Sequence, residues 1–481
     1  MKMRKINAKR LRITLNGKKA GSMFIAIAVF FIVLLMLSRA TELSVALTLA
    51  IICFGIMLWA LEPIPLGLTS FMILFLFFIF KVAEPTIVLS GFSSPAVYLI
   101  VAGMMLARAV NETMLTERIA YRIIKKWGET ARGISASLLV IIQLQAFFIP
   151  ATAVRTTLVL PIAETILKLT KAKPGSNLEK LLLFTVAYGG NISGTAILTA
   201  AIGNILTVEL LKRYTGVTIH YFQWFLYTFP LWLLLIPAIW LLLLHLFPLS
   251  RGEGQFSEIT REMEERLSRL GPLTKKEKLC IVILLITVVL WMTEPLHHLH
   301  PSVPTIMAVI LMCLPGICIA KWEKVVNVNF DNVILIGVTL SMGFVFIDSG
   351  AIQYIGEWLN ISTVKSVFQH DLLAIACIVF FTQIFHKFIS NVSTAVVTLI
   401  PIIITISRFA GVEPHLFAFT AGITSLYGFI LTVETMPNVI IHGTGKVTQQ
   451  DFFRPGIYAT IVTMVITIFV AATWWNIIGI I

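Results

Sequence analysis

The feature that most constrains the fold of this chain is a series of apolar runs that begins near residue 23 and continues almost to the end. A helix needs about 20 apolar residues to cross a bilayer. Apolar runs of about 15 to 33 residues lie at about 23–38, 43–61, 67–82, 94–110, 181–211, 222–248, 279–293, 304–320, 331–349, 411–443 and 456–479. Of the 481 residues, 58% are hydrophobic and 13% are charged, about half the charged share of a soluble domain. The sequence therefore predicts an all-α polytopic membrane protein with about 11 transmembrane helices.

Two further apolar stretches, at about 134–166 and 372–406, are each interrupted near the middle. The first contains Pro-Ala-Thr at 150–152, and the second contains Ser-Asn-Val-Ser at 390–393. A stretch of roughly 33 residues is too long for one crossing and too short for two. We therefore expect two re-entrant hairpins, whose irregular tips lie inside the protein where their backbone groups find partners.

The positive charge of the chain lies in a few segments. A net charge of +13 would suggest nucleic-acid binding in a soluble protein, but membrane proteins also retain Lys and Arg on cytoplasmic loops. If the basic segment 1–22 is cytoplasmic and each hairpin returns to its own side, the basic loops 117–132, 168–180 and 251–278 are all cytoplasmic. We expect a cell-membrane protein with its N-terminus in the cytoplasm, its C-terminus outside and no nucleic-acid partner.

The second half of the chain repeats motifs of the first half. Leu-Trp-x-x-Glu-Pro occurs at 58–63 and again at 290–295, an offset of 232. The interruptions at Pro150 and Ser390 differ by 240, and Asn204 has a counterpart in Asn438. An odd number of predicted crossings separates the copies, so the two repeats are expected to be inverted. Inverted repeats with matching broken helices are typical of secondary transporters, whose binding site lies near the bilayer midplane.

These repeats predict the domain organisation. Residues 23–248 form the first inverted repeat and residues 279–481 the second, joined by a charged cytoplasmic linker at 249–278.

Ionisable residues near the interruptions are candidate functional groups, because each costs several kcal/mol in a membrane unless it has a partner or a function. Arg155 follows the first tip, Lys387 precedes the second, and Glu434 lies beside the second broken helix. The two cations suit an anionic substrate. Glu434 could hold a cation or a proton, or pair with His386 or Lys387, and the sequence leaves this choice open.

Several of these motifs resemble those of the divalent anion:sodium symporter family, which carries citrate, C4-dicarboxylates and sulfate. The similarity rests on Ser390-Asn391-Val392 and on the segment 434–438, Glu-Thr-Met-Pro-Asn, and it extends over nearly the whole chain. The resemblance implies a homodimer in which a transport domain moves against a scaffold domain by an elevator mechanism. It also implies Ser-Asn-Thr motifs at both tips that bind substrate carboxylates and sodium.

This chain departs from that pattern in the first repeat. The first tip reads Pro-Ala-Thr at 150–152, or Ala-Thr-Ala one residue later, and the segment 201–204 reads Ala-Ile-Gly-Asn. Ala146 and His386 occupy the position that resembles a sodium-binding hydroxyl in the family. Sodium needs a cage of oxygen atoms, whereas Arg155 and Lys387 supply fixed charge. We therefore expect a sodium-independent exchanger, or a proton-coupled carrier, of di- or tricarboxylates.

The expected substrate-binding residues all lie at a tip or a broken helix: Thr152, Arg155, Asn204, Lys387, Ser390, Asn391, Val392, Thr435, Pro437 and Asn438. Ser390, Asn391 and Glu434 form a candidate sodium or proton site. No cofactor is expected, apart from sodium as a coupling ion if the protein is instead a sodium-coupled dicarboxylate or sulfate symporter. Another carrier of inorganic oxyanions and another class of ion transporter remain alternatives. The sequence has neither an intramembrane Asp pair nor a His-Glu-x-x-His helix, so an enzyme is not expected.

Overall fold

The computed structural model describes residues 17–249, 256–359, 362–389 and 392–480, and every regular element in these ranges is a helix. Helical segments in the described ranges that are long and apolar enough to span a membrane by themselves number seven. They are Lys19–Leu37, Leu43–Leu61, Pro85–Asn111, Tyr221–Leu246, Phe330–Asp348, Val392–Ala410 and Gln449–Trp475. The all-α polytopic fold predicted from the sequence is confirmed.

The first half contains short and long helices in a fixed order. They are α1 (Gly17–Leu37), α2 (Leu43–Leu61), α3 (Leu66–Ile79), α4 (Pro85–Leu89), η1 (Ser90–Ser93), α5 (Pro95–Asn111), α6 (Leu115–Trp127), α7 (Ala131–Gln145), α8 (Thr152–Leu169), α9 (Asn177–Ile192), η2 (Leu198–Ala200), α10 (Ile202–Thr215) and α11 (Tyr221–Leu246).

The second half follows a connecting helix, α12. The elements are α12 (Ser257–Leu270), α13 (Lys275–Met292), α14 (Glu294–His297), α15 (Ser302–Cys313), α16 (Trp322–Val325), α17 (Phe330–Asp348), α18 (Ala351–Leu359), α19 (Ser362–Phe368), α20 (Asp371–Phe385), α21 (Val392–Ala410), α22 (His415–Thr424), α23 (Met436–His442), α24 (Gln449–Val470) and η3 (Ala471–Trp475).

The two halves repeat one order of helices. The matched pairs are α2 with α13, α3 with α15, α4 with α16, α5 with α17, α6 with α18, α7 with α20, α8 with α21, α9 with α22, α10 with α23, and α11 with α24. The packing between the halves is reciprocal. Helix α15 packs on α5 as α3 packs on α17, and α10 packs on α21 and α22 as α23 packs on α8 and α9. Such exchanged contacts indicate two copies related by a two-fold axis.

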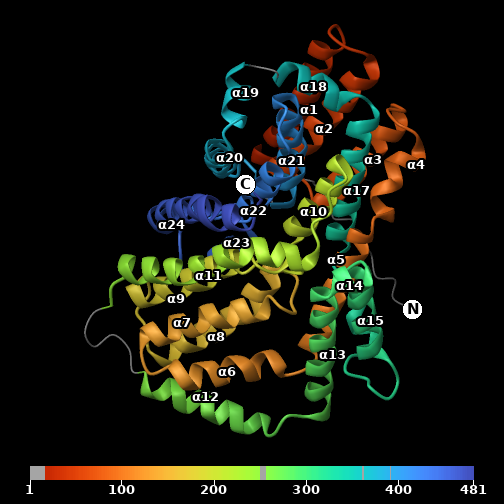
Figure 1. The fold of residues 1–481 in the computed structure, drawn as a ribbon. Coiled ribbons are helices and arrows are strands. Elements are labelled where there is room, and N and C mark those ends of the chain that lie inside the picture. The colour runs from red at the N-terminus through yellow and green to blue at the C-terminus, as the bar shows by residue number, and fades with distance from the viewer. Residues whose placement is uncertain (1–16, 250–255, 360–361, 390–391, 481) are drawn as a thin grey trace, which may run out of the picture.

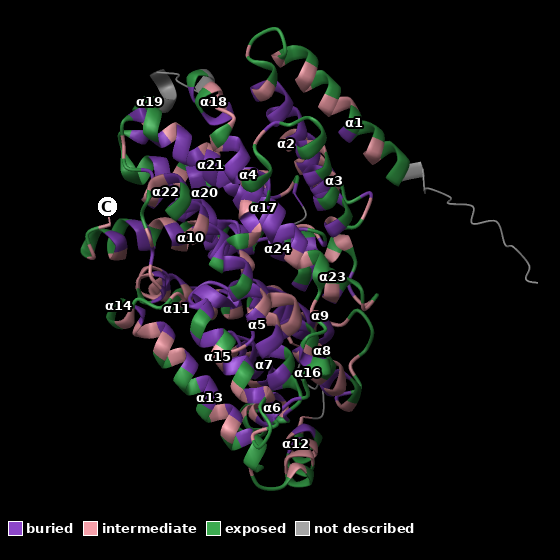
Figure 2. Ribbon diagram, turned by 90° about the vertical axis from the view of Figure 1, so that its right-hand side faces the viewer, coloured by how far each residue is buried: buried purple, intermediate pink, exposed green. Residues whose placement is uncertain are grey.

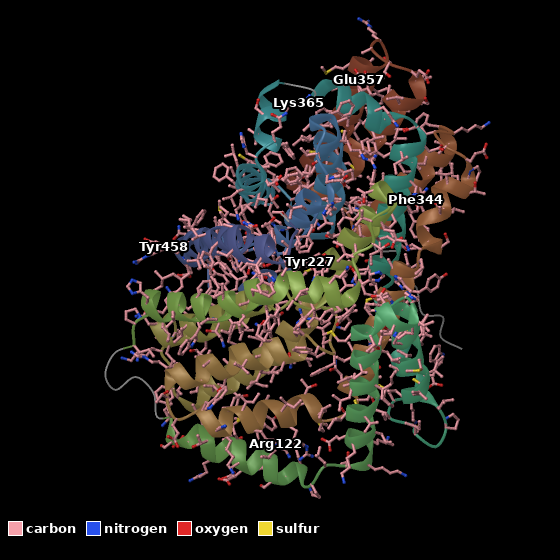
Figure 3. All side chains as sticks on the ribbon, viewed as in Figure 1. Arg122, Tyr227, Phe344, Glu357, Lys365 and Tyr458 are labelled. Carbon is pink, nitrogen blue, oxygen red and sulfur yellow. The ribbon has the colours of Figure 1, made fainter. Side chains whose placement is uncertain are left out.

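The matched helices form two groups, one upright at the right of Figure 1 and one beside it. In Figure 1, α5, α13 and α15 stand side by side at the lower right, and α7, α8, α9 and α11 are stacked to their left. Helices α20, α21, α22 and α24 lie above that stack, where α24 packs on α11. Tyr227, labelled in Figure 3, marks this junction, because its carbonyl accepts a hydrogen bond from the Trp475 indole at 2.9 Å.

The re-entrant stretches fold as helix, tip and helix. Thr130 begins α7 by accepting a hydrogen bond from the Gly133 amide at 3.0 Å. Helix α7 then ends at Gln145, and α8 begins at Thr152. Figure 2 shows that burial is highest along the inner helices, including α17 and α21, and lower on α1 and α12. The interrupted helices therefore end inside the protein.

Candidate functional site

Four interruptions in the helices meet at the centre of the molecule. Two are the tips between α7 and α8 and between α20 and α21. The others are the breaks between α9 and α10, at 193–201, and between α22 and α23, at 425–435. The contacts described below join each tip to a break and join the two breaks to each other.

Asn204 and Asn438 perform the same task in the two breaks. The Asn204 side-chain amide donates to the carbonyls of Gly194 (2.7 Å) and Ile197 (3.0 Å), which lie ten and seven residues upstream. The Asn438 amide donates to carbonyls at the same two spacings, those of Gly428 and Leu431, both at 3.0 Å. Each asparagine thus binds backbone carbonyls of the non-helical segment that precedes its own helix. Both residues, predicted to bind substrate, hold the breaks in shape.

Side chains from both repeats join the two breaks directly. The Asn191 amide donates to the Gly428 carbonyl at 2.7 Å and to the Asn438 side-chain oxygen at 3.1 Å. The Thr195 and Tyr427 hydroxyls share a hydrogen bond of 3.2 Å. All of these residues are buried. The centre is therefore a polar network between repeats, surrounded by apolar helices.

Arg155 joins the first tip to the first break. Its guanidinium donates to the carbonyls of Ile149 at the tip and Ala200 in the break, the latter at 3.0 Å. It also donates to the Ser193 hydroxyl at 3.0 Å. The side chain is completely buried, and one guanidinium nitrogen, Nη2, lacks a hydrogen-bond partner in the described part of the chain. One free donor of a buried cation is therefore available for an anion.

Lys387 joins the second tip to the second break. Its ammonium lies 2.9 Å from Glu434 Oε1, and Glu434 is 1% exposed at its side chain. The other carboxylate oxygen accepts from the Ile430 amide at 3.1 Å. The sequence left the partner of Glu434 open, and the structure selects Lys387. Within the described ranges, both ring nitrogens of the neighbouring, fully buried His386 lack a hydrogen-bond partner.

Helix N-termini also point to an anion at this centre. Helices α8, α10 and α23 begin here, directly after Ala151, Ala201 and Thr435, and none of these residues provides a side-chain cap. Uncapped N-termini present free backbone amides and the positive end of the helix dipole. Such ends bind carboxylates and other oxyanions.

The remaining predicted residues lie at contacts between the helices. Thr152 contacts the backbone position of Gly194, and Val392 contacts that of Gly203. Pro437 packs where a side chain on Gly190 would be, at 3.0 Å from its Cβ position. These contacts pack the tips against the breaks and the first repeat against the second. Ser390 and Asn391 lie outside the described residues, so the candidate cation site is described only at Glu434, which Lys387 already neutralises.

Two glutamines at this centre were not among the residues predicted from the sequence, although they are related by the repeat offset. Gln143 and Gln383 differ by 240 residues, as the tips do. The Gln143 amide donates to the Gly189 carbonyl at 3.0 Å, and the Gln383 amide to the Thr424 carbonyl at 2.9 Å. Each ties an inner hairpin helix to the end of the broken helix beside it.

Paired broken helices around a buried polar centre define the class of secondary transporters. The particular family follows from the sequence. The profile described as the sodium:sulfate symporter transmembrane region matches residues 18–481, and the chain belongs to this family of membrane transporters.

Individual relatives are distant but cover most of the chain. A protein named "Membrane protein" from Cupriavidus necator is 26% identical, over 95% of this chain and 92% of its own length. The sodium-dependent dicarboxylate transporter SdcS of Staphylococcus saprophyticus is 24% identical, over 86% and 82%. SdcS of Staphylococcus aureus USA300 is also 24% identical. The crystal structure of the Alcanivorax borkumensis YdaH transporter superposes with a TM-score of 0.57 and 13% identity, covering 82% of this chain and 88% of that one. This last likeness concerns the fold alone.

Proposed function

We propose that this protein exchanges di- or tricarboxylate anions across the cytoplasmic membrane without sodium. The observation that carries the proposal is that one protein cation joins the tip to the break in each repeat, although Arg155 follows the first tip and Lys387 precedes the second. Arg155 binds the Ala200 carbonyl, and Lys387 binds the Glu434 carboxylate. Ala200 and Glu434 each lie four residues before the equivalent asparagines, Asn204 and Asn438.

The surroundings of Arg155 are those that a sodium ion would require. Two backbone carbonyls and one hydroxyl converge on its guanidinium. Carbonyl and hydroxyl oxygens from unwound helices are the usual sodium ligands in transporters of this kind. A covalently attached cation that uses these oxygens removes the need for a dissolved one.

The charge balance favours exchange over net transport. Glu434 neutralises Lys387, but no carboxylate in the described part of the chain pairs with Arg155. A buried charge without a counter-charge is costly to carry through a membrane. An anionic substrate supplies the counter-charge, so the loaded site crosses more readily than the empty one.

An elevator movement fits the two groups of helices. In this proposal, the hairpins and broken helices of both repeats, 23–248 and 279–481, form the transport domain. The upright helices around α5, α13, α15 and α17 form the scaffold. Pro150 at the first tip sits against Gly103 of α5, where an added Cβ would lie 2.9 Å from the proline ring. This contact would then be one that opens and closes with the movement.

The proposal also covers the orientation in the membrane and the oligomeric state. Helices α6 and α12 carry many of the charged residues expected on the cytoplasmic face, which supports a cytoplasmic N-terminus and an outside C-terminus. The family resemblance supports a homodimer.

A sodium-coupled dicarboxylate or sulfate symporter is the second candidate. The names of the SdcS relatives and of the family support it. One structural observation also favours it: within the described ranges, the buried hydroxyls of Thr394 and Thr435 lack hydrogen-bond partners. Such oxygens could bind sodium together with a second-tip backbone carbonyl.

Transport by purified protein in liposomes distinguishes the two candidates. Labelled citrate, succinate and sulfate are offered with and without unlabelled substrate inside, and with and without a sodium gradient. Exchange predicts uptake only into vesicles that contain substrate, at the same rate with or without sodium. Sodium-driven uptake into empty vesicles would overturn the proposal in favour of the symporter.

A further inference from the structure

A cavity with polar and apolar lining residues lies away from the central site, between α6, α8 and α12. Its volume is about 280 Å³, enough for a group of several non-hydrogen atoms rather than one water. Thr116 and Glu117 line it from α6, Leu158 and Ile162 from α8, and Arg266 from α12. Neither the proposed transport cycle nor the repeat symmetry accounts for it.

Two walls of this cavity are fixed to each other. Arg118 of α6 is buried, binds Glu277 at 2.8 Å and donates to the carbonyls of Leu270 and Gly271 at the end of α12. Lys125 of α6 pairs with Glu264 of α12 at 2.6 Å. Figure 3 shows Arg122 of α6 beside α12 at the lower edge of the molecule. The third wall, α8, is the hairpin helix that carries Arg155.

The cavity lining includes unused acceptors. In the described part of the chain, Glu117 Oε2 and the Thr116 hydroxyl are buried without a hydrogen-bond partner. Burial raises the pKa of the Glu117 carboxyl. Pro161, which also lines the cavity, has no amide hydrogen and so leaves the Thr157 carbonyl without its helical donor. Acceptors of this kind call for a ligand with several N–H donors and a positive charge.

Other residues of the lining are a cation or are apolar. Arg266 contributes a guanidinium that binds Glu262 at 2.7 Å and lies over the Tyr121 ring, and a guanidinium with its five N–H donors can also bind an anion. Leu158, Pro161 and Ile162 give an apolar flank on α8, and Pro161 is exposed. An uncovered apolar face of a membrane hairpin meets lipid.

We propose that this cavity binds the headgroup of an aminophospholipid, with its primary ammonium at Glu117 and Thr116 and its phosphate at Arg266. A choline headgroup fits less well, because its quaternary nitrogen has no N–H to donate to the carboxylate, hydroxyl and carbonyl. The acyl chains continue along the apolar flank of α8. A bound lipid would thereby link the fixed pair α6 and α12 to the hairpin helix.

Native mass spectrometry of the detergent-solubilised protein tests the binding directly and needs no transport substrate. The protein is mixed with phosphatidylethanolamine or with phosphatidylcholine of the same chains. Wild-type protein should retain the ethanolamine lipid at least about tenfold better, the range expected for a hydrogen bond to a charged group. Glu117→Gln should lose this preference, whereas Glu129→Gln, which removes an exposed carboxylate outside the cavity, should keep it.

Two further arms define the ligand. Soluble ethanolamine is added as a competitor, and displacement of the lipid by it at low concentration would assign the site to a free amine, overturning the lipid proposal. Equal retention of both lipids, or an unchanged preference in Glu117→Gln, would also overturn it. Met263→Trp, which fills the cavity from α12, should reduce lipid retention without removing any charge and so checks that the cavity itself is used.

Discussion

In the described part of the chain, Arg155 is the charged side chain that joins the first tip to the first break, and Arg155→Ala removes this connection. Arg155 donates to three acceptors, the Ile149 and Ala200 carbonyls and the Ser193 hydroxyl. A hydrogen bond from a charged donor contributes about 1.5–3 kcal/mol, and an orphaned buried acceptor costs a similar amount. If only two of the three bonds matter to the substrate-binding state, the loss is at least about 3 kcal/mol, or roughly a hundredfold in exchange rate.

The assay is succinate exchange in liposomes at matched protein incorporation, with thermal unfolding recorded in parallel to separate misfolding from lost function. Arg132→Ala, which removes an exposed arginine, is the control and should exchange normally. Free guanidinium ion should partly restore Arg155→Ala, because the three oxygens remain in place. Arg155→Lys should recover little, since one ammonium cannot reach all three acceptors. Full activity of Arg155→Ala in a folded protein would refute the reasoning.

Three other predictions concern stability. Asn204→Ala and Asn438→Ala should each lower the unfolding free energy, by about 1 kcal/mol for each hydrogen bond lost, and Asn438→Ala should lower it more because its side-chain oxygen also accepts from Asn191. The exposed Asn476→Ala should leave it unchanged, and denaturant titrations that show no loss in either break variant would argue against this role. Lys387→Met should destabilise the protein by about 3–5 kcal/mol, since it leaves the buried Glu434 carboxylate unpaired. Adding Glu434→Gln to this variant should restore folding but not exchange. A double variant no more stable than Lys387→Met alone would contradict the ion pair. Burial alone would raise the pKa of Glu277, but hydrogen bonds from Arg118 and Thr274 outweigh it and hold the pKa below the ordinary value. The stabilisation from ionised Glu277 is therefore complete above the ordinary glutamate pKa of about 4.3 and is lost only as the pH falls through the lower folded value. Melting temperatures of wild type and Glu277→Gln should converge on acidification, and a constant difference would count against this stabilisation.

The sequence predicts the fold well because apolar length and interruption are local properties. The hairpin at 134–166 follows from a stretch too long for one crossing and too short for two, and α7, the tip and α8 lie there. The equivalence of Asn204 and Asn438 follows from their offset, and their hydrogen bonds confirm it. Gln143 and Gln383 are also related by the offset between the tips, but they lie inside the hairpin helices. The interrupted apolar pattern points to the tips and not to these helices.

The site is less predictable because its partners are far apart in the chain. Arg155 and Ala200 are separated by 45 residues, and no local pattern shows that the guanidinium binds the protein's own carbonyls. Likewise, charge alone could not choose among His386, Lys387 and a bound cation as the partner of Glu434. That choice depends on how the second tip packs against the second break.

The central claim is that Arg155 and Lys387 take the place of dissolved sodium. Its most direct test is to follow radioactive sodium and labelled succinate together in the same liposomes during exchange. The account predicts succinate movement with no accompanying sodium flux and no change when potassium replaces sodium. Sodium that enters in a fixed ratio to succinate would contradict it.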